Sequence, residues 1–364
     1  MGTVVTYAPH DGDGRTQHEI AARVGVARAL ASLKGFEFGG GYEPALRRKG
    51  ALYFVPSQTL SAGEARELGI RGEQDLFGGV VPYPFVANKT IAHPLAAPDA
   101  YRPQGWSEAF PERVRDVVLP GFAAFTREDA RRAAQALLES GPVRIKPGRG
   151  IGGRGQVIVE YPDDPVFEDF DEDELAQHGL VVEPNLEAIT TFSVGRVCVG
   201  EMRVAYCGTQ KTALDHEGQL VYGGSDLLVM RGGFAELRRL SVPPQILTAI
   251  EQAQAFDAAA AQFDGLFASR RNYDVLRGRD ARGRWHCGVL EQSWRIGGAS
   301  GPEVAALEAF HADPRLRAVH ARSTEAYDTD AAVPAGAIVH FRGVDSRAGP
   351  LTKYTLVEPH EHAS

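Results

Sequence analysis

Cysteine is scarce and scattered in this chain, and its scarcity excludes several kinds of site. The 364 residues contain three cysteines, Cys198, Cys207 and Cys287, with no spacing typical of a zinc site or a dithiol motif. An odd number of separated thiols does not build a disulfide framework. The sequence therefore predicts a protein of a reducing compartment, the cytoplasm.

Long apolar runs and an excess of positive charge are also lacking. No stretch approaches the roughly 20 apolar residues of a membrane-spanning helix, and no segment has the pattern of a signal peptide. The formal net charge is −8, and eight acids without a base lie between Asp163 and Glu174, so the remainder is nearly neutral. The sequence predicts neither a nucleic-acid partner nor a membrane partner, and the acidic run is expected to be a solvated loop and helix start.

Glycine, in contrast, is concentrated in the stretch Gly141–Glu160, which is GPVRIKPGRGIGGRGQVIVE. Apolar and basic residues alternate up to Lys146, and an apolar run follows the glycines. This pattern predicts a strand, a glycine-rich loop and a return strand. Glycine permits positive φ and lets backbone N–H groups approach an anion. The loop is expected to close over a phosphate group with Lys146 at its base, using Gly150, Gly152, Gly153 and Gly155.

An ordinary hairpin, whose glycines serve only the turn, is the simpler interpretation of this loop. A Rossmann fingerprint is excluded because no helix pattern follows the glycines, and a Walker loop is excluded because Gly-Lys-Ser/Thr is absent. The order of strand, lysine, proline, glycine-rich loop and strand is more specific than the glycines alone.

A second group of candidate residues lies on two later segments that predict strands joined by a turn. Asp274 is on the first segment and Glu291 on the second. Antiparallel pairing can bring such carboxylates to one end of a sheet, where two of them suit Mg²⁺. The sequence VLEQSWRIGG, which begins at Val289, adds Ser293 and Arg295 to the group.

Together the two groups resemble the ATP-grasp superfamily, whose metal strand commonly reads Glu-x-Asn-x-Arg followed by glycines. The resemblance implies that Asp274 and Glu291 bind Mg²⁺ or Mn²⁺ and that Arg295 faces the transferred phosphoryl or acyl group. Ser293 stands where the family usually has Asn. A serine hydroxyl would be a weaker metal ligand than the amide oxygen it replaces.

The resemblance also implies the nucleotide contacts. Lys89 matches the first phosphate lysine and Lys146 the second, while Val182 and Glu183 match the segment whose backbone reads the adenine edge. The ribose contact stays open. The resemblance spans about residues 89–298, and the whole chain is similar to an uncharacterised bacterial family regarded as ATP-grasp-like.

The expected fold is α/β with α+β lobes: an ATP-grasp fold in which two lobes clasp ATP behind an N-terminal open α/β domain. Residues 1–115 are expected to form this pre-grasp domain. Residues 116–188 would form the small lobe with the glycine-rich lid. Residues 189–364 would form the large lobe with the metal site and C-terminal strands.

The expected activity is that of an ATP- and Mg²⁺-dependent ligase that activates a carboxylate as an acyl phosphate for attack by an amine or similar nucleophile. Two alternatives stay open: phosphoryl transfer to a small acceptor, and a nucleotide-binding regulatory protein that has lost catalysis. For Arg270 and Arg271, surface charge and binding of a substrate carboxylate are both open. The expected partners are a small-molecule carboxylate and a nucleophile, and a homodimer is left open.

Overall fold

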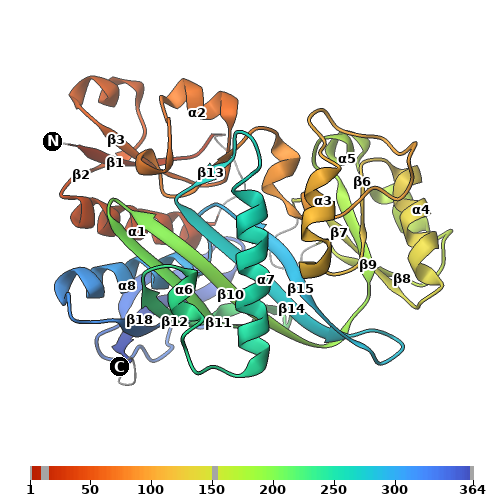
Figure 1. Ribbon diagram of the computed structural model, residues 1–364. Helices are drawn as coiled ribbons and strands as arrows, with labels where there is room; N and C mark the ends of the chain where they lie inside the picture. Colours follow the sequence, from red (N-terminus) through yellow and green to blue (C-terminus); the bar gives the residue numbers. More distant parts are fainter. Residues whose placement is uncertain (1, 10–15, 150–154, 361–364) are drawn as a thin grey trace.

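The computed structural model describes residues 2–9, 16–149 and 155–360, and the statements below concern this part of the chain. Its strands form four sheets (Figure 1). No helix of the described residues is long and apolar enough to cross a membrane.

The leading part is a parallel sheet of the order β2-β1-β3 with α1 packed against it. The helix begins at Thr16, which forms a capping box with Glu19, and ends at Gly35, whose φ of +63° is a left-handed cap. The leading part therefore has the α/β character that was expected of it. The elements are β1 (Thr3–Tyr7), α1 (Gln17–Lys34), β2 (Glu37–Gly41), η1 (Pro44–Lys49), β3 (Leu52–Pro56), β4 (Leu60–Ser61), α2 (Ala62–Leu68), η2 (Glu73–Asp75) and β5 (Gly79–Val81).

A four-stranded antiparallel sheet of the order β6-β9-β7-β8 forms the second part. The predicted strands on either side of the glycine-rich loop are confirmed, because β7 and β8 pair antiparallel. Thr126 caps α4 by accepting from the backbone N–H of Asp129, a role for which threonine is favoured. The elements, with their connections, are η3 (Pro84–Ala87), η4 (Lys89–Ala92), α3 (Ala109–Val114), η5 (Arg115–Val117), β6 (Phe122–Ala124), α4 (Arg127–Leu138), β7 (Val143–Pro147), β8 (Val157–Val159), η6 (Pro165–Asp169), α5 (Glu172–His178) and β9 (Leu180–Pro184).

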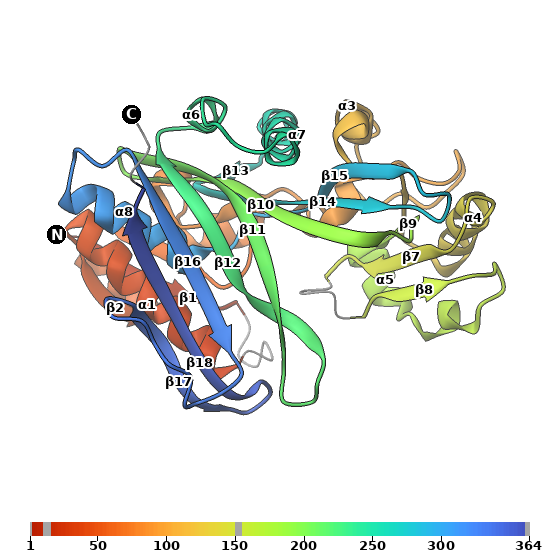
Figure 2. The same ribbon diagram turned by 90° about the horizontal axis from the view of Figure 1, so that it is seen from below.

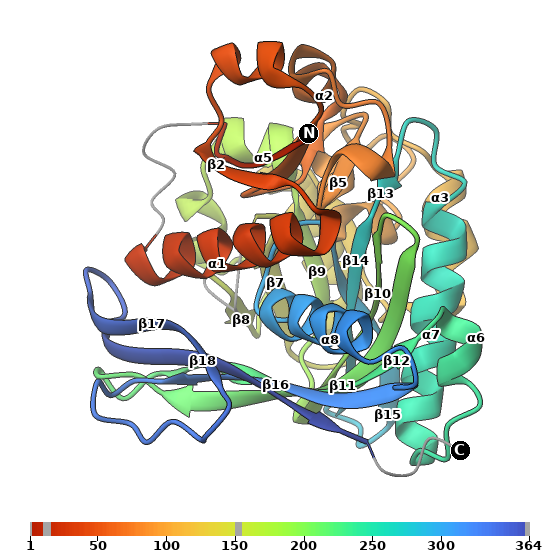
Figure 3. The same cartoon turned by 90° about the vertical axis from the view of Figure 1, so that its left-hand side faces the viewer.

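The third part is an eight-stranded sheet of the order β15-β14-β10-β11-β12-β16-β18-β17. Helix α7 packs on one face, and α8 lies on the other beside α1 (Figures 2 and 3). The elements are β10 (Glu187–Val199), β11 (Met202–Leu214), β12 (Leu220–Arg231), α6 (Phe234–Leu237), α7 (Pro244–Ala260), β13 (Phe267–Ala268), β14 (Arg270–Arg279), β15 (Trp285–Ser293), α8 (Ser300–Ala312), β16 (Ala318–Ala326), β17 (Ile338–Asp345) and β18 (Gly349–Pro359).

One strand of the third part does not join this large sheet. β13 pairs antiparallel with β5, which also pairs with β4, so the three form a separate small sheet between the first and third parts. The side chain of Ser269 reinforces this connection, because its hydroxyl donates to the carbonyl of Leu76 and accepts from the N–H of Gly78.

Candidate active site

Lys146 and Glu183 form a buried ion pair on one face of the second sheet. β7 and β9 are antiparallel neighbours in which Lys146 opposes Val181, so Lys146 and Glu183 are diagonal neighbours on the same face. The ammonium of Lys146 bonds to Oε2 of Glu183, and Nε2 of His93 lies 3.2 Å from Oε1. Burial raises the pKa of Glu183, but Lys146 and His93 outweigh it and hold that pKa at about 2.

The glycine-rich loop is described only at its ends. Gly148 follows β7, and a Cβ on it would lie 2.3 Å from the carbonyl oxygen of His178, so the backbone packing there requires glycine. Gly155 has a φ of +71°. The predicted phosphate-binding residues Gly150, Gly152 and Gly153 lie outside the described residues, so the structure gives no contact for them.

Lys89 connects the second and third parts of the molecule. It begins η4, and the side chain of Asn88 caps this short helix by accepting from the N–H of Thr90. The Lys89 side chain is 2% exposed, and its Nζ lies 3.3 Å from the carbonyl oxygen of Pro147 and 3.3 Å from Oε2 of Glu291. The sequence predicted Lys89 only from its position along the chain. In the structure, its ammonium lies between β7, the strand that carries Lys146, and β15, the strand that carries Glu291.

Asp274 and Glu291 stand directly opposite each other on β14 and β15, and a bulge follows them. The antiparallel hairpin predicted from the sequence is thereby confirmed. Oδ1 of Asp274 accepts from Nε2 of Gln210 at 2.8 Å and from Nδ2 of Asn272 at 2.9 Å. Burial and then the nearby carboxylate of Glu291 raise the pKa of Asp274.

This carboxylate pair fits a hard divalent cation. Opposed residues of an antiparallel pair have Cβ atoms about 4.5–5.5 Å apart, which lets two carboxylates reach one ion of Mg²⁺ or Mn²⁺ type. The pKa of Asp274 is raised first by burial and then by the Glu291 carboxylate, and a bound cation would offset the second of these effects. The described residues contain no group of three or more His, Cys, Asp or Glu side chains that could hold a metal.

Arg295 follows β15 immediately, and its Nη1 donates to the carbonyl of Ile296 at 3.0 Å. Its side chain is partly buried, and burial lowers the pKa of the guanidinium while the carboxylate of Glu291 acts to raise it. Arg295 and Glu291 therefore act on each other electrostatically. The expected role of Arg295 toward the transferred phosphoryl or acyl group stays a prediction.

The surface-charge alternative for Arg270 and Arg271 is wrong, because both side chains are buried. Neighbouring residues of a strand point to opposite faces. Arg270 pairs with Glu303 of α8 at 2.8 Å, while Arg271 pairs with Asp257 of α7 and with Glu73, both at 3.3 Å. The guanidinium groups are occupied within the chain, so we do not carry the substrate-binding alternative into the proposal below.

Val182 lies inside the second sheet, paired with Phe122 of β6 and Ile145 of β7. The expected contact of Val182 and Glu183 with adenine stays a prediction. The structure adds a role for the Glu183 side chain, as the partner of Lys146, that the sequence did not indicate.

Sequence reasoning missed several residues that contact the predicted ones. Asn272 precedes Asp274 by two positions on one strand, and strand alternation could have found it. The others come from distant segments and have no local signal in the sequence: His93, Gln210, Asp257 and Glu303.

Comparison with known proteins gives the family and the fold. Residues 5–355 match the family described as "Protein of unknown function (DUF3182)". The chain belongs to this DUF3182 family. No curated protein matches the sequence.

Solved structures share the architecture of this DUF3182 chain at low identity. Biotin carboxylase from Campylobacter jejuni, solved as a beta-gamma-ATP complex, has a TM-score of 0.50 and 12% identity over 98% of this chain and 87% of its own. Carboxyaminoimidazole ribonucleotide synthase from Aspergillus clavatus, complexed with ATP, has a TM-score of 0.49 and 14% identity over 99% and 94%. The biotin carboxylase match carries the argument for the fold, and the second, with a TM-score below 0.5, carries none. The DUF3182 chain has the ATP-grasp fold.

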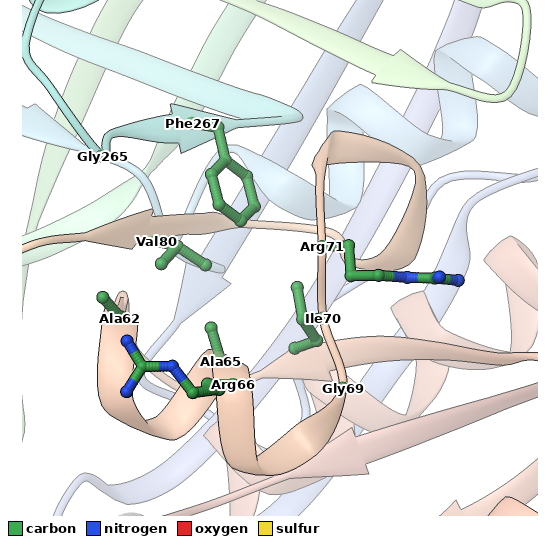
Figure 4. A pocket seen from close by; sticks show the side chains of 9 residues that line it. All are labelled: Ala62, Ala65, Arg66, Gly69, Ile70, Arg71, Val80, Gly265 and Phe267. Atoms are coloured by element: carbon green, nitrogen blue, oxygen red, sulfur yellow. The ribbon is translucent and has the colours of Figure 1, made fainter.

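A separate hollow of about 680 Å³ lies between α2 and the strands β5 and β13 (Figure 4). Its lining combines apolar side chains such as Ile70, Val80 and Phe267 with Arg66 and Arg71. Of the residues that the structure describes, those lining this hollow include none of the predicted site residues. We therefore define the candidate active site of the DUF3182 chain by the charged residues described above, Lys89, Lys146, Glu183, Asp274 and Glu291, and not by this hollow.

Proposed function

We propose that this protein is an ATP-dependent ligase that activates a small carboxylate for attack by an amine or a similar nucleophile. The observation that carries the proposal is the position of Lys89, whose ammonium lies 3.3 Å from both the Pro147 carbonyl oxygen and the Glu291 carboxylate. The Lys89 ammonium thereby contacts both motifs, the strand that carries Lys146 and the strand that carries Glu291, which are far apart in the sequence. ATP phosphates bound there would meet positive charge from both motifs.

Each proposed role follows from charge and position. A carboxylate is a poor electrophile, and phosphorylation converts it into an acyl phosphate with a good leaving group. Lys89 and Lys146 hold the phosphates of ATP, because positioning and charge neutralisation dominate catalysis of phosphoryl transfer. Arg295 stabilises the acyl phosphate and the oxyanion formed by nucleophilic attack. A divalent cation held by Asp274 and Glu291 supplies further neutralisation of phosphate charge.

The remaining roles implied by the ATP-grasp resemblance complete the proposal. The backbone of Val182 and Glu183 contacts the adenine edge, and the loop Gly150–Gly155 supplies phosphate-binding N–H groups. Residues 1–115, 116–188 and 189–364 act as pre-grasp domain, small lobe and large lobe. β13 qualifies this division, since it belongs to the third segment by sequence and to the sheet of β4 and β5 by pairing.

The deciding experiment measures Mg²⁺-dependent ADP release with a panel of small carboxylates, each with and without amines. The proposal expects ADP release that requires a carboxylate, and a product in which the carboxylate is joined to the amine. A phosphorylated acceptor without a joined product would indicate a phosphotransferase instead. Nucleotide binding without ADP release under every condition would indicate a regulatory protein.

A matched pair of lysine variants tests the site itself. Lys211 is an exposed lysine paired with Asp226, so Lys211→Met controls for loss of one positive charge. Lys89→Met is expected to weaken ATP binding because it removes the charge shared by both motifs, whereas Lys211→Met should not. Equal ATP affinity of the two variants, measured by calorimetry, would contradict the proposed phosphate role of Lys89.

A further inference from the structure

Ser293 is held by a buried arginine. Nη1 of Arg270 lies 3.3 Å from Oγ of Ser293, 3.2 Å from its carbonyl oxygen and 2.7 Å from the carbonyl oxygen of Arg295. Nε and Nη2 of the same guanidinium bind Glu303, which is fully buried at the start of α8. One guanidinium thus ties the end of β15 to α8, and the Ser293 hydroxyl oxygen is among the atoms it binds.

This contact opposes metal binding by Ser293. Mg²⁺ binds oxygen at about 2.1 Å, so an ion on Ser293 Oγ would lie within about 5.4 Å of Arg270 Nη1, given the 3.3 Å contact. A divalent cation that close to a guanidinium in a buried site is repelled by it. The Asp274–Glu291 pair differs from Ser293 because it brings two opposed carboxylates, whose negative charges attract a cation although Lys89 lies 3.3 Å from Oε2 of Glu291.

The residue opposite Ser293 does not supply the missing ligand either. Asn272 pairs with Ser293 across the strands, and its amide could in principle replace the asparagine expected at 293. Its Oδ1 instead accepts from Ser193 at 2.7 Å and from Tyr206 at 2.8 Å, while its amide N–H donates to Asp274 at 2.9 Å. The amide oxygen is occupied, and the side facing Asp274 is a donor.

We propose that this site takes a single divalent cation, bound by Asp274 and Glu291, and that Arg270 and Glu303 hold Ser293 outside its coordination sphere. The inference rests on the proposed function, because it concerns the cation that accompanies ATP. Ser293 is then a positioning residue that fixes the end of β15 and the start of the Arg295 segment. The fixed charges of Lys89 and Arg295 supply the positive charge that a second cation would bring.

Counting cations tests this directly. The full chain is saturated with AMP-PNP, a non-hydrolysable ATP analogue, and bound Mn²⁺ and bound nucleotide are counted by equilibrium dialysis, with electron paramagnetic resonance reporting Mn²⁺. The expected result is a single Mn²⁺ per bound AMP-PNP in the unaltered protein, in Ser293→Ala and in Ser293→Asn, with unchanged Mn²⁺ affinity in Ser293→Ala. Glu291→Gln is the positive control and should lose the bound Mn²⁺.

Arg271 offers a matched control for the strand, since it is equally buried next to Arg270 but pairs with Asp257 on the other face. Arg271→Lys should leave the Mn²⁺ count unchanged. Arg270→Lys removes the forked guanidinium that holds Ser293, so the double variant Arg270→Lys with Ser293→Asn should bind a second Mn²⁺. Failure of this double variant to bind it would overturn the role of Arg270.

Two other outcomes would overturn the inference while leaving the proposed function intact. These are two Mn²⁺ ions per AMP-PNP in the unaltered protein, or a second Mn²⁺ in Ser293→Asn alone. A protein that binds neither AMP-PNP nor nucleotide-dependent Mn²⁺ would instead overturn the proposed function, and the inference with it.

Discussion

Replacing Lys146 should test stability and nucleotide binding at the same time, because its charge has two partners. In the protein without ATP, the ammonium is paired with the fully buried carboxylate of Glu183. Lys146→Met would leave that carboxylate without its main counter-charge. Removal of one member of a buried ion pair costs about 3–5 kcal/mol, so we expect a large loss of unfolding free energy as well as weaker ATP binding.

The pKa of Glu183 gives an independent magnitude. That pKa is about 2 in the folded protein against a usual 4.5, and at 1.36 kcal/mol per pKa unit the difference corresponds to roughly 3 kcal/mol. The folded-state pKa is depressed, so this stability is fully present above pH 4.5 and is lost as the pH falls from about 4.5 to about 2. This value combines the effects of burial, Lys146 and His93, so it gives only the order of magnitude of the stability that depends on the ionised Glu183 carboxylate.

A double-mutant cycle separates the two roles of Lys146. Urea unfolding at pH 7 is measured for Lys146→Met, Glu183→Gln and the double variant, and ATP-analogue binding is measured by calorimetry for each. The double variant should be more stable than Lys146→Met, since no charge is left unpaired, yet it should still bind the analogue weakly. Glu183→Gln keeps the ammonium and should bind better than either variant that lacks it. A Lys146→Met protein with unchanged stability would refute the pairing argument, and one with unchanged affinity would refute the phosphate role.

Two further predictions concern Glu291 and Gly148. Glu291→Gln should abolish turnover and reduce Mg²⁺-dependent ATP affinity. Metal-free nucleotide binding should stay equal or improve, because an anion facing the phosphates is removed. Steady-state kinetics measure turnover and calorimetry measures affinity, and normal turnover with Mg²⁺ would mean that β15 is not the metal strand. Gly148→Ala should destabilise the fold by about 1–3 kcal/mol in urea unfolding, since its Cβ would overlap the carbonyl oxygen of His178. Gly233→Ala is the control, with open space at that position, and an equal loss in both variants would refute the packing argument.

The sequence predicted the parts of the site whose signal is local. Strand alternation and glycine spacing located the Lys146 hairpin, and two strands joined by a turn located Asp274 and Glu291, which the structure pairs directly. Partners from distant segments could not be predicted in this way. The pairing of Glu183 with Lys146 and of Arg270 with Glu303 depends on how sheets and helices pack, which no short window of sequence contains.

Two strands of the large sheet, β12 and β16, were not predicted from the sequence, and glycines explain the first of them. Gly223 and Gly224 indicate a break in the chain, yet β12 continues through them beside a bulge. Gly224 has a φ of +135°, and a Cβ there would lie 2.1 Å from the carbonyl oxygen of Ser323. These glycines serve a close approach of neighbouring strands rather than a turn, and that distinction depends on β16, the other missed strand.

The small sheet of β4, β5 and β13 has a consequence for how the polypeptide acquires its structure during synthesis. The leading part emerges from the ribosome before the third part, but the edge of β5 that faces β13 stays unpaired until Phe267 and Ala268 have been made. The contact of Arg271 with Glu73 arrives equally late. The four strands of the second part, in contrast, all lie within residues 122–184 and can pair as soon as that stretch is complete. The pairing of β13 with β5 is slow by comparison, because the long intervening segment of chain must first bring the two strands together. The middle of the chain is therefore expected to become protease-resistant before its beginning does.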